Sequence, residues 1–147
     1  MRSKKRLSNT APVAMRMALA AGFLSAVADR FGLWGPINTP GVSWGGFAKF
    51  LDYTATILPF LPTTLVAVAG WTSTVAEIVL GVALLAGVRV RLAALASGVL
   101  LLTFAIAMTT ALGPEAPLSY SVWTAAAGAF LLARDRPAAC QEPAVAA

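Results

Sequence analysis

Glu77 stands near the middle of an otherwise uncharged apolar run that extends from residue 63 to residue 88. A charged side chain at the centre of a membrane-spanning helix costs about 2.5–3.5 kcal/mol on insertion scales, so it should face other helices and have a partner. Arg16, inside the first apolar run, is the expected partner. At 1.5 Å per residue, it lies ~25 Å from the outer end of its run and Glu77 lies ~21 Å from the end of its own. We therefore predict a buried Arg16–Glu77 ion pair.

An alternative for these two residues has no ion pair. Arg16 would then extend to the lipid head groups, and Glu77 would be protonated or hydrogen-bonded to hydroxyl groups.

A second set of side chains that could bind a ligand lies toward the outer ends of the apolar runs. A fixed positive charge, a phenol hydroxyl and aromatic walls would suit a quinone head group with its tail, or a sulfur oxyanion. The same residues would equally suit a solvated rim. The candidate pocket comprises Asp29, Arg30, Trp71, Tyr120 and Trp123.

Several kinds of site are excluded by composition. The chain has no histidine, which rules out bis-histidine haem and histidine-based zinc sites. Its one cysteine, Cys140, cannot form an intramolecular disulfide or a Cys-x-x-Cys pair. No phosphate-binding glycine loop or nucleophile elbow is present. We expect no haem and no metal, leave quinone as the one candidate cofactor, and do not expect catalysis by this chain alone.

The elements that position these residues are membrane helices. The chain is 59% apolar and only 12% charged, against roughly 25% charged in soluble domains. Runs of about 20 apolar residues have the length needed to cross a bilayer. They predict an all-α, four-helix transmembrane bundle with spans at about 13–33, 63–88, 92–112 and 117–133. The first run is expected to stay uncleaved, because charged residues stand where a signal peptide would have small ones.

Basic residues indicate the orientation of the bundle. Residues 1–12 form a basic N-terminal tail, 13–133 the membrane domain and 134–147 a C-terminal tail. The positive-inside rule then places both termini in the cytoplasm, as expected for a multi-pass protein of a bacterial inner membrane. The net charge of +5 is accounted for by this topology, so no nucleic-acid partner is expected. The basic residues on that side are Arg2, Lys4, Lys5, Arg6, Arg89, Arg91, Arg134 and Arg136.

The segment from 34 to 62 is expected to carry a short helix outside the membrane. Its first half is rich in glycine and proline, whereas apolar residues recur at helical spacing from Trp44 to Leu58. This pattern predicts an extracytoplasmic amphipathic helix that either anchors the bundle at the interface or covers an outward-facing pocket. Small residues spaced by four, such as Ala94 and Gly98, predict close packing of the spans.

Two stretches carry a resemblance to a known family. The sequence Phe23-Leu24-x-Ala26-x-Ala28-Asp29-Arg30-Phe31-Gly32 resembles the end of the first helix in the DoxX family. The stretch Glu77-x-x-x-Gly81-x-x-Leu84-Leu85-x-Gly87-x-x-x-Arg91-x-Ala93-Ala94 is similar to that family's second-to-third helix signature. The resemblance covers about residues 16–133. It implies a small four-span bacterial membrane protein. Some relatives are linked to thiosulfate:quinone oxidoreduction or to membrane redox assemblies, and most have no assigned activity.

Three functions are consistent with these observations. The leading one is an accessory subunit of a membrane redox assembly that carries a quinone site, with a redox protein or a second copy of the chain as partner. If the chain is enzymatic, it would be a quinone-linked oxidoreductase subunit. The second is a structural or scaffold protein without a ligand. The third is a small transporter-like carrier, which the lack of a visible inverted repeat disfavours.

Overall fold

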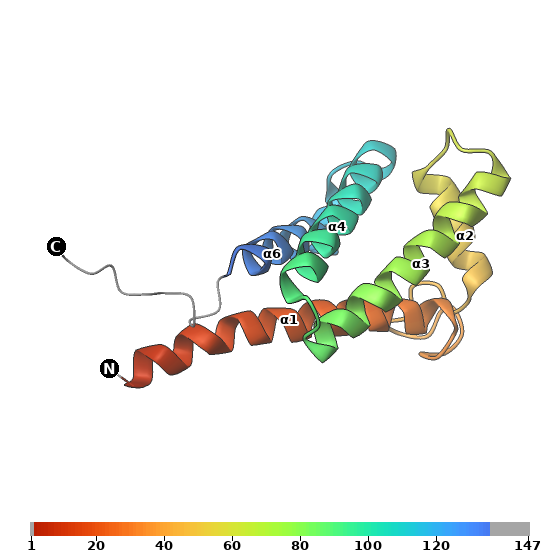
Figure 1. Cartoon of the computed structure of the whole chain (residues 1–147). Coiled ribbons are helices and arrows are strands. Elements are labelled where there is room, and N and C mark those ends of the chain that lie inside the picture. Colours follow the sequence, from red (N-terminus) through yellow and green to blue (C-terminus); the bar gives the residue numbers. More distant parts are fainter. Residues whose placement is uncertain (1, 136–147) are drawn as a thin grey trace.

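A computed structural model describes residues 2–135, with side chains from Thr10 onward, and this part of the chain is helical with no strand. Three helices are long and apolar enough to cross a membrane: the Thr10–Arg30 part of α1, all of α3 and all of α4. The chain is therefore a helical membrane protein. Figure 1 shows how its helices are arranged. Its helices are α1 Arg2–Arg30, α2 Phe47–Ile57, α3 Thr63–Ala86, α4 Val90–Leu112, α5 Glu115–Ser119 and α6 Val122–Arg134.

Two helix pairs make up the bundle, α1 with α3 and α4 with α6. Both rely on glycine for close approach. A Cβ at Gly81 of α3 would lie 3.1 Å from the Leu24 side chain of α1. A Cβ at Gly98 of α4 would lie 2.7 Å from the Phe130 ring of α6. Glycine at such contacts lets helices pack by van der Waals contact where lipid offers no hydrophobic driving force.

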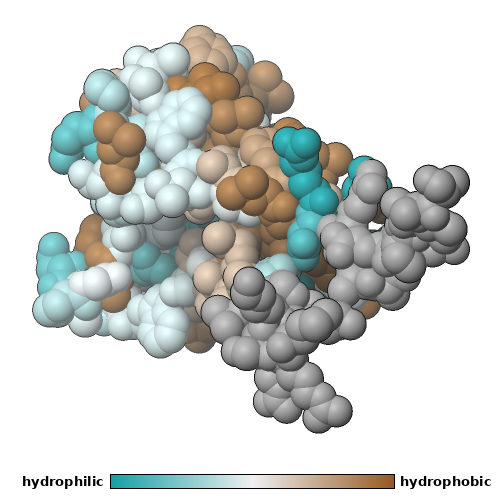
Figure 2. All heavy atoms as spheres, turned by 90° about the vertical axis from the view of Figure 1, so that its left-hand side faces the viewer, coloured by the Kyte–Doolittle hydropathy of each residue, from teal (hydrophilic) through white to brown (hydrophobic). Residues whose placement is uncertain are grey.

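The core lies where these two pairs meet, and it is built largely from small residues. Alanines supply many of the contacts, so the backbones approach one another closely. The core cluster comprises Leu19, Ala20, Phe23, Leu84, Ala93, Ala94, Ala129, Leu132 and Ala133. The opposite faces of the long helices are apolar and exposed; on α3 they include Val68, Val75, Val79 and Val82. Viewed from the left of Figure 1, strongly hydrophobic residues gather at the top and centre of the surface, and residues of intermediate or hydrophilic character lie to their left (Figure 2). This surface suits a lipid environment.

The predicted span at 117–133 is wrong as one continuous helix. The structure divides it into α5 and α6, with Ser121 in the left-handed conformation at φ 56°. Serine competes with helical hydrogen bonding, and the Ser119-Tyr120-Ser121 stretch interrupts the helix here. With 13 residues, α6 is about 20 Å long, short of the roughly 30 Å hydrocarbon core.

The ends of helix α1 differ from the predicted boundaries of the N-terminal tail and the first span. Helix α1 begins at Arg2, so the segment expected as a basic tail continues the helix. It ends at Arg30 rather than near residue 33, because Gly32 adopts φ 72° and turns the chain. The helix expected between Trp44 and Leu58 is α2, which buries Phe50, Thr54 and Ile57 and packs against α3.

Candidate functional site

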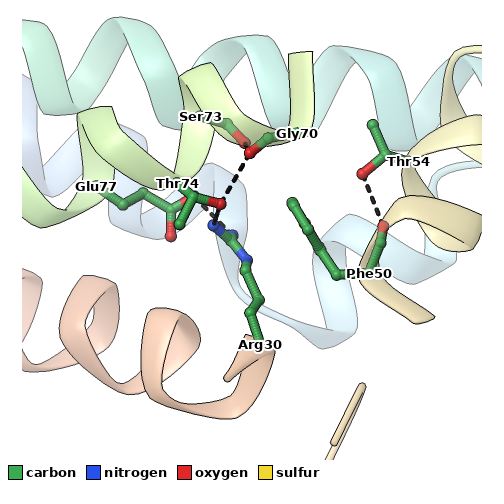
Figure 3. A network of polar contacts seen from close by, with 7 residues as sticks. All are labelled: Arg30, Phe50, Thr54, Gly70, Ser73, Thr74 and Glu77. Atoms are coloured by element: carbon green, nitrogen blue, oxygen red, sulfur yellow. Dashed lines mark hydrogen bonds and ion pairs between the residues drawn. The ribbon is translucent and has the colours of Figure 1, made fainter. Parts of the chain in front are cut away.

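Arg30 and Glu77 form an ion pair inside the helix bundle. The Arg30 Nη2 atom lies 2.7 Å from Glu77 Oε1, and the two side chains are only 3% and 2% exposed. Arg30 comes from the last residue of α1 and Glu77 from the middle of α3 (Figure 3). A buried charge with its counter-charge removed is strongly destabilising, so these helices depend on each other at this point.

Thr74, one turn before Glu77 on α3, makes a second polar contact with the arginine, whose buried Nε has no hydrogen-bond partner among the described residues. Arg30 Nη1 donates to Thr74 Oγ1 at 2.9 Å, and that hydroxyl donates to the Gly70 carbonyl at 2.8 Å (Figure 3). Thr74 and Glu77 are spaced i, i+3, which places them on one face of the helix. The guanidinium therefore bridges two groups on consecutive turns of α3.

Aromatic rings enclose the other side of the guanidinium. The Arg30 Cζ atom stands 3.9 Å from the centroid of the Phe50 ring and 5.4 Å from that of Trp44. Arginine over an aromatic face gains a cation–π attraction that strengthens when water is excluded. Phe50 belongs to α2, so the arginine also fastens the short outer helix to the two membrane helices.

Asp29 is also buried, but it acts on the backbone of the loop that follows α1. Its carboxylate accepts hydrogen bonds from the backbone N–H groups of Ser43, Trp44 and Gly45 at 2.8, 3.2 and 3.1 Å. Gly45 adopts φ 60°, and a Cβ there would lie 2.4 Å from the backbone nitrogen of Ile37. Asp29 thus folds the loop back so that Trp44 lies beside Arg30.

The predicted Arg16–Glu77 pair is wrong, because Glu77 pairs with Arg30. The depth argument assumed that the outer ends of α1 and α3 are level. In the structure α1 stops opposite Thr74, ~17 Å from the start of α3, because α2 packs against the N-terminal half of α3 near Gly70. Arg16 therefore lies near the other end of α3. Its Nη1 atom would be 3.0 Å from a Cβ added at Gly87.

The five residues of the predicted ligand pocket differ in their exposure and in their surroundings. Trp71 is half exposed and packs in an aromatic cluster, 4.3 Å from Phe47 and 6.4 Å from Phe31 between ring centroids. Trp123 is 37% exposed at the start of α6. Asp29 and Arg30 lie beneath the loop, not at an open mouth.

Tyr120 is 67% exposed and lies on the side of the bundle that faces α2. Burial raises the pKa of Tyr53 on α2, and the nearby Tyr120 raises it further. The Tyr53 phenol is therefore a neutral hydrogen-bond donor at physiological pH. Tyr120 is the residue of the predicted pocket that an external ligand reaches most readily.

Phe50 and Thr74 contact Arg30, and neither was predicted from the sequence as part of the site. The i, i+3 spacing of Thr74 and Glu77, with Phe50 on the apolar face of α2, was the available signal. Within residues 10–135, no group of three histidine, cysteine, aspartate or glutamate side chains is placed to hold a metal ion. Comparison with protein-family models, with curated proteins and with solved structures found no match.

Proposed function

We propose that this chain is a DoxX-like accessory subunit of a membrane redox assembly and does not itself carry out the chemistry. The observation that supports this most is the closed Arg30–Glu77 pair. Its charges contact one another, Thr74 and the Phe50 ring, and they are almost fully buried. A site that bound and released a substrate through these groups would need them open to it.

The resemblance and the geometry point to the same residues. Arg30 belongs to the first DoxX-like stretch and Glu77 opens the second, and the structure joins them at 2.7 Å. These stretches therefore supply a structural contact that holds the spans together. The redox assignment rests on the resemblance, and the supporting role rests on the contact.

The specific observation that favours a scaffold without any ligand is the burial of Asp29 and Arg30, whose polar groups contact the protein itself. A quinone site would have to lie at the α2–Tyr120 side, where Tyr120 is exposed, and not at Arg30. Purification in mild detergent followed by mass spectrometry of co-purifying lipids and quinones separates the two functions.

We expect a quinone analogue to raise the melting temperature of the wild-type protein and to lose that effect in Tyr120→Phe, because the phenol would hydrogen-bond the head group. The exposed aromatic Phe60 supplies a matched control, since Phe60→Leu should keep the shift. Thiosulfate is tested in the same way. Absence of both co-purifying quinone and any shift in the wild type would contradict the ligand site and favour the scaffold.

We further propose a four-span topology in which α5 and α6 together form the last crossing and both termini face the cytoplasm. Cysteines introduced at Ser43 and Glu115 should react with an impermeant thiol reagent added to intact cells. Native Cys140, which lies outside the described residues, should react only after the cells are lysed. Labelling of Cys140 in intact cells would overturn this topology.

A further inference from the structure

Arg16 is a half-buried arginine that makes no ion pair with another residue in the described range 10–135. Its Nε atom is buried and makes no hydrogen bond, and within residues 10–135 the carboxylates in ion pairs are Glu77, with Arg30, and Asp52, with Lys49. The guanidinium lies against Gly87, the residue that ends α3. Arg30 also has an unpaired Nε, but its charge is balanced by Glu77, whereas Arg16 has no paired carboxylate among the described residues and is free to bind an external anion.

Two further arginines lie where α3 connects to α4. Arg89 and Arg91 come two and four residues after Gly87, and both are exposed. Neither makes an ion pair among the described residues. This turn joins two membrane-spanning helices, so Arg16, Arg89 and Arg91 stand at the depth where a helix leaves the hydrocarbon and meets the head groups. We call these three residues the basic end.

An apolar groove follows α1 from Met15, the residue before Arg16, to Phe23. It has a volume of about 300 Å³, lies between α1, α4 and α6, and is lined by residues that include Met15, Leu19, Gly22, Leu101, Thr124 and Ala125. Met15 is the neighbour of Arg16 in sequence, and Gly22 lies ~10 Å farther along α1 toward the middle of the bundle. A Cβ at Gly22 would meet no atom within 4 Å, so the groove is open at that point.

We propose that the basic end binds the phosphate group of an anionic phospholipid, with one acyl chain of the lipid in the groove. The arginines supply donors and charge that match a phosphate. The groove starts at the depth of Arg16 and runs inward, as an acyl chain runs from its head group. This inference requires that the protein is in a membrane, and it holds whether or not the chain serves a redox assembly.

The test compares lipids of different charge with the purified full-length protein in detergent. Phosphatidylglycerol should raise the melting temperature by about 5 °C or more at saturation, and phosphatidylcholine should raise it much less. Each arginine near an anionic surface is worth about fivefold in affinity, so Arg16→Gln should weaken binding of phosphatidylglycerol by that factor. Arg89→Gln with Arg91→Gln, both at exposed positions, tests the same charge without a risk to folding. Lys49→Gln, at an exposed cation on α2, is the matched control and should change nothing.

A substitution at Gly22 tests whether the groove holds an acyl chain. Gly22→Leu adds a side chain in the open part of the groove, so it should reduce lipid binding while leaving the lipid-free melting temperature unchanged or higher. Equal stabilisation by phosphatidylglycerol and phosphatidylcholine would overturn the proposal. A full effect from inorganic phosphate alone, insensitive to Gly22→Leu, would show a free-anion site and would overturn the assignment to a lipid.

Discussion

Glu77→Gln should destabilise the protein by about 3–5 kcal/mol, since it leaves the buried Arg30 charge without its counter-charge. The measurement is the free energy of unfolding in detergent, from a denaturant or thermal titration. The exposed pair Lys49–Asp52, with a separation of 3.5 Å, is the matched control. Asp52→Asn there should have little effect, because a surface ion pair contributes little to stability.

A double-mutant cycle tests whether Arg30 or Arg16 is the partner of Glu77. Arg30→Met combined with Glu77→Leu removes both charges and replaces them with apolar groups, so it should recover most of the stability that either single change loses. Arg16→Gln combined with Glu77→Gln should be additive, because Arg16 lies at the other end of α3. A large coupling between Arg16 and Glu77, with none between Arg30 and Glu77, would contradict the structure.

Asp29→Ala should have the second largest effect and act on a different part of the molecule. It removes the acceptor of three backbone N–H groups, those of Ser43, Trp44 and Gly45. Each buried donor left unsatisfied costs about 1–3 kcal/mol, and water will reach some of them, so we expect a loss of about 2 kcal/mol or more. Amide hydrogen exchange at residues 43–45 should become much faster.

Asp29→Asn keeps one acceptor oxygen and should give an intermediate result. Asp52→Ala, at an exposed aspartate on α2, is the control for loss of an acidic side chain. Because Trp44 stacks near Arg30, Asp29→Ala should also change the tryptophan fluorescence. Unchanged exchange at residues 43–45 in Asp29→Ala would show that the carboxylate does not hold the loop.

The helices were readable from the sequence because apolar periodicity and length are local properties. The runs that became α3 and α4 were placed to within two residues. Glu77 was also recognised as a buried charge, since its cost in the membrane requires a partner. The identity of that partner was not readable, because it depends on how far α1 slides along α3. That register is set by α2, whose position beside the N-terminal half of α3 is a tertiary property.

The remainder of the site was hidden for similar reasons. Asp29 had been grouped with Arg30 as a ligand contact, yet it bonds to backbone amides some 15 residues away that no side-chain pattern reveals. Phe50 appeared as one member of an apolar face and gave no sign of stacking on an arginine. The break at Ser121 was missed because the flanking residues are apolar enough to read as one span.

The break at Ser121 has a consequence for the bilayer. The first backbone N–H groups of α6 have no side-chain cap, and unsatisfied amides are costly in hydrocarbon. In the four-span arrangement, the lipid beside α6 must bring its polar layer inward to meet them, so the membrane becomes thinner on this one flank. Hydrophobic mismatch of this kind costs a fraction of a kcal/mol per Å and sorts proteins between membranes of different thickness. Short-chain lipids should gather around α6, and a neighbouring protein with an equally short span would relieve the same deformation.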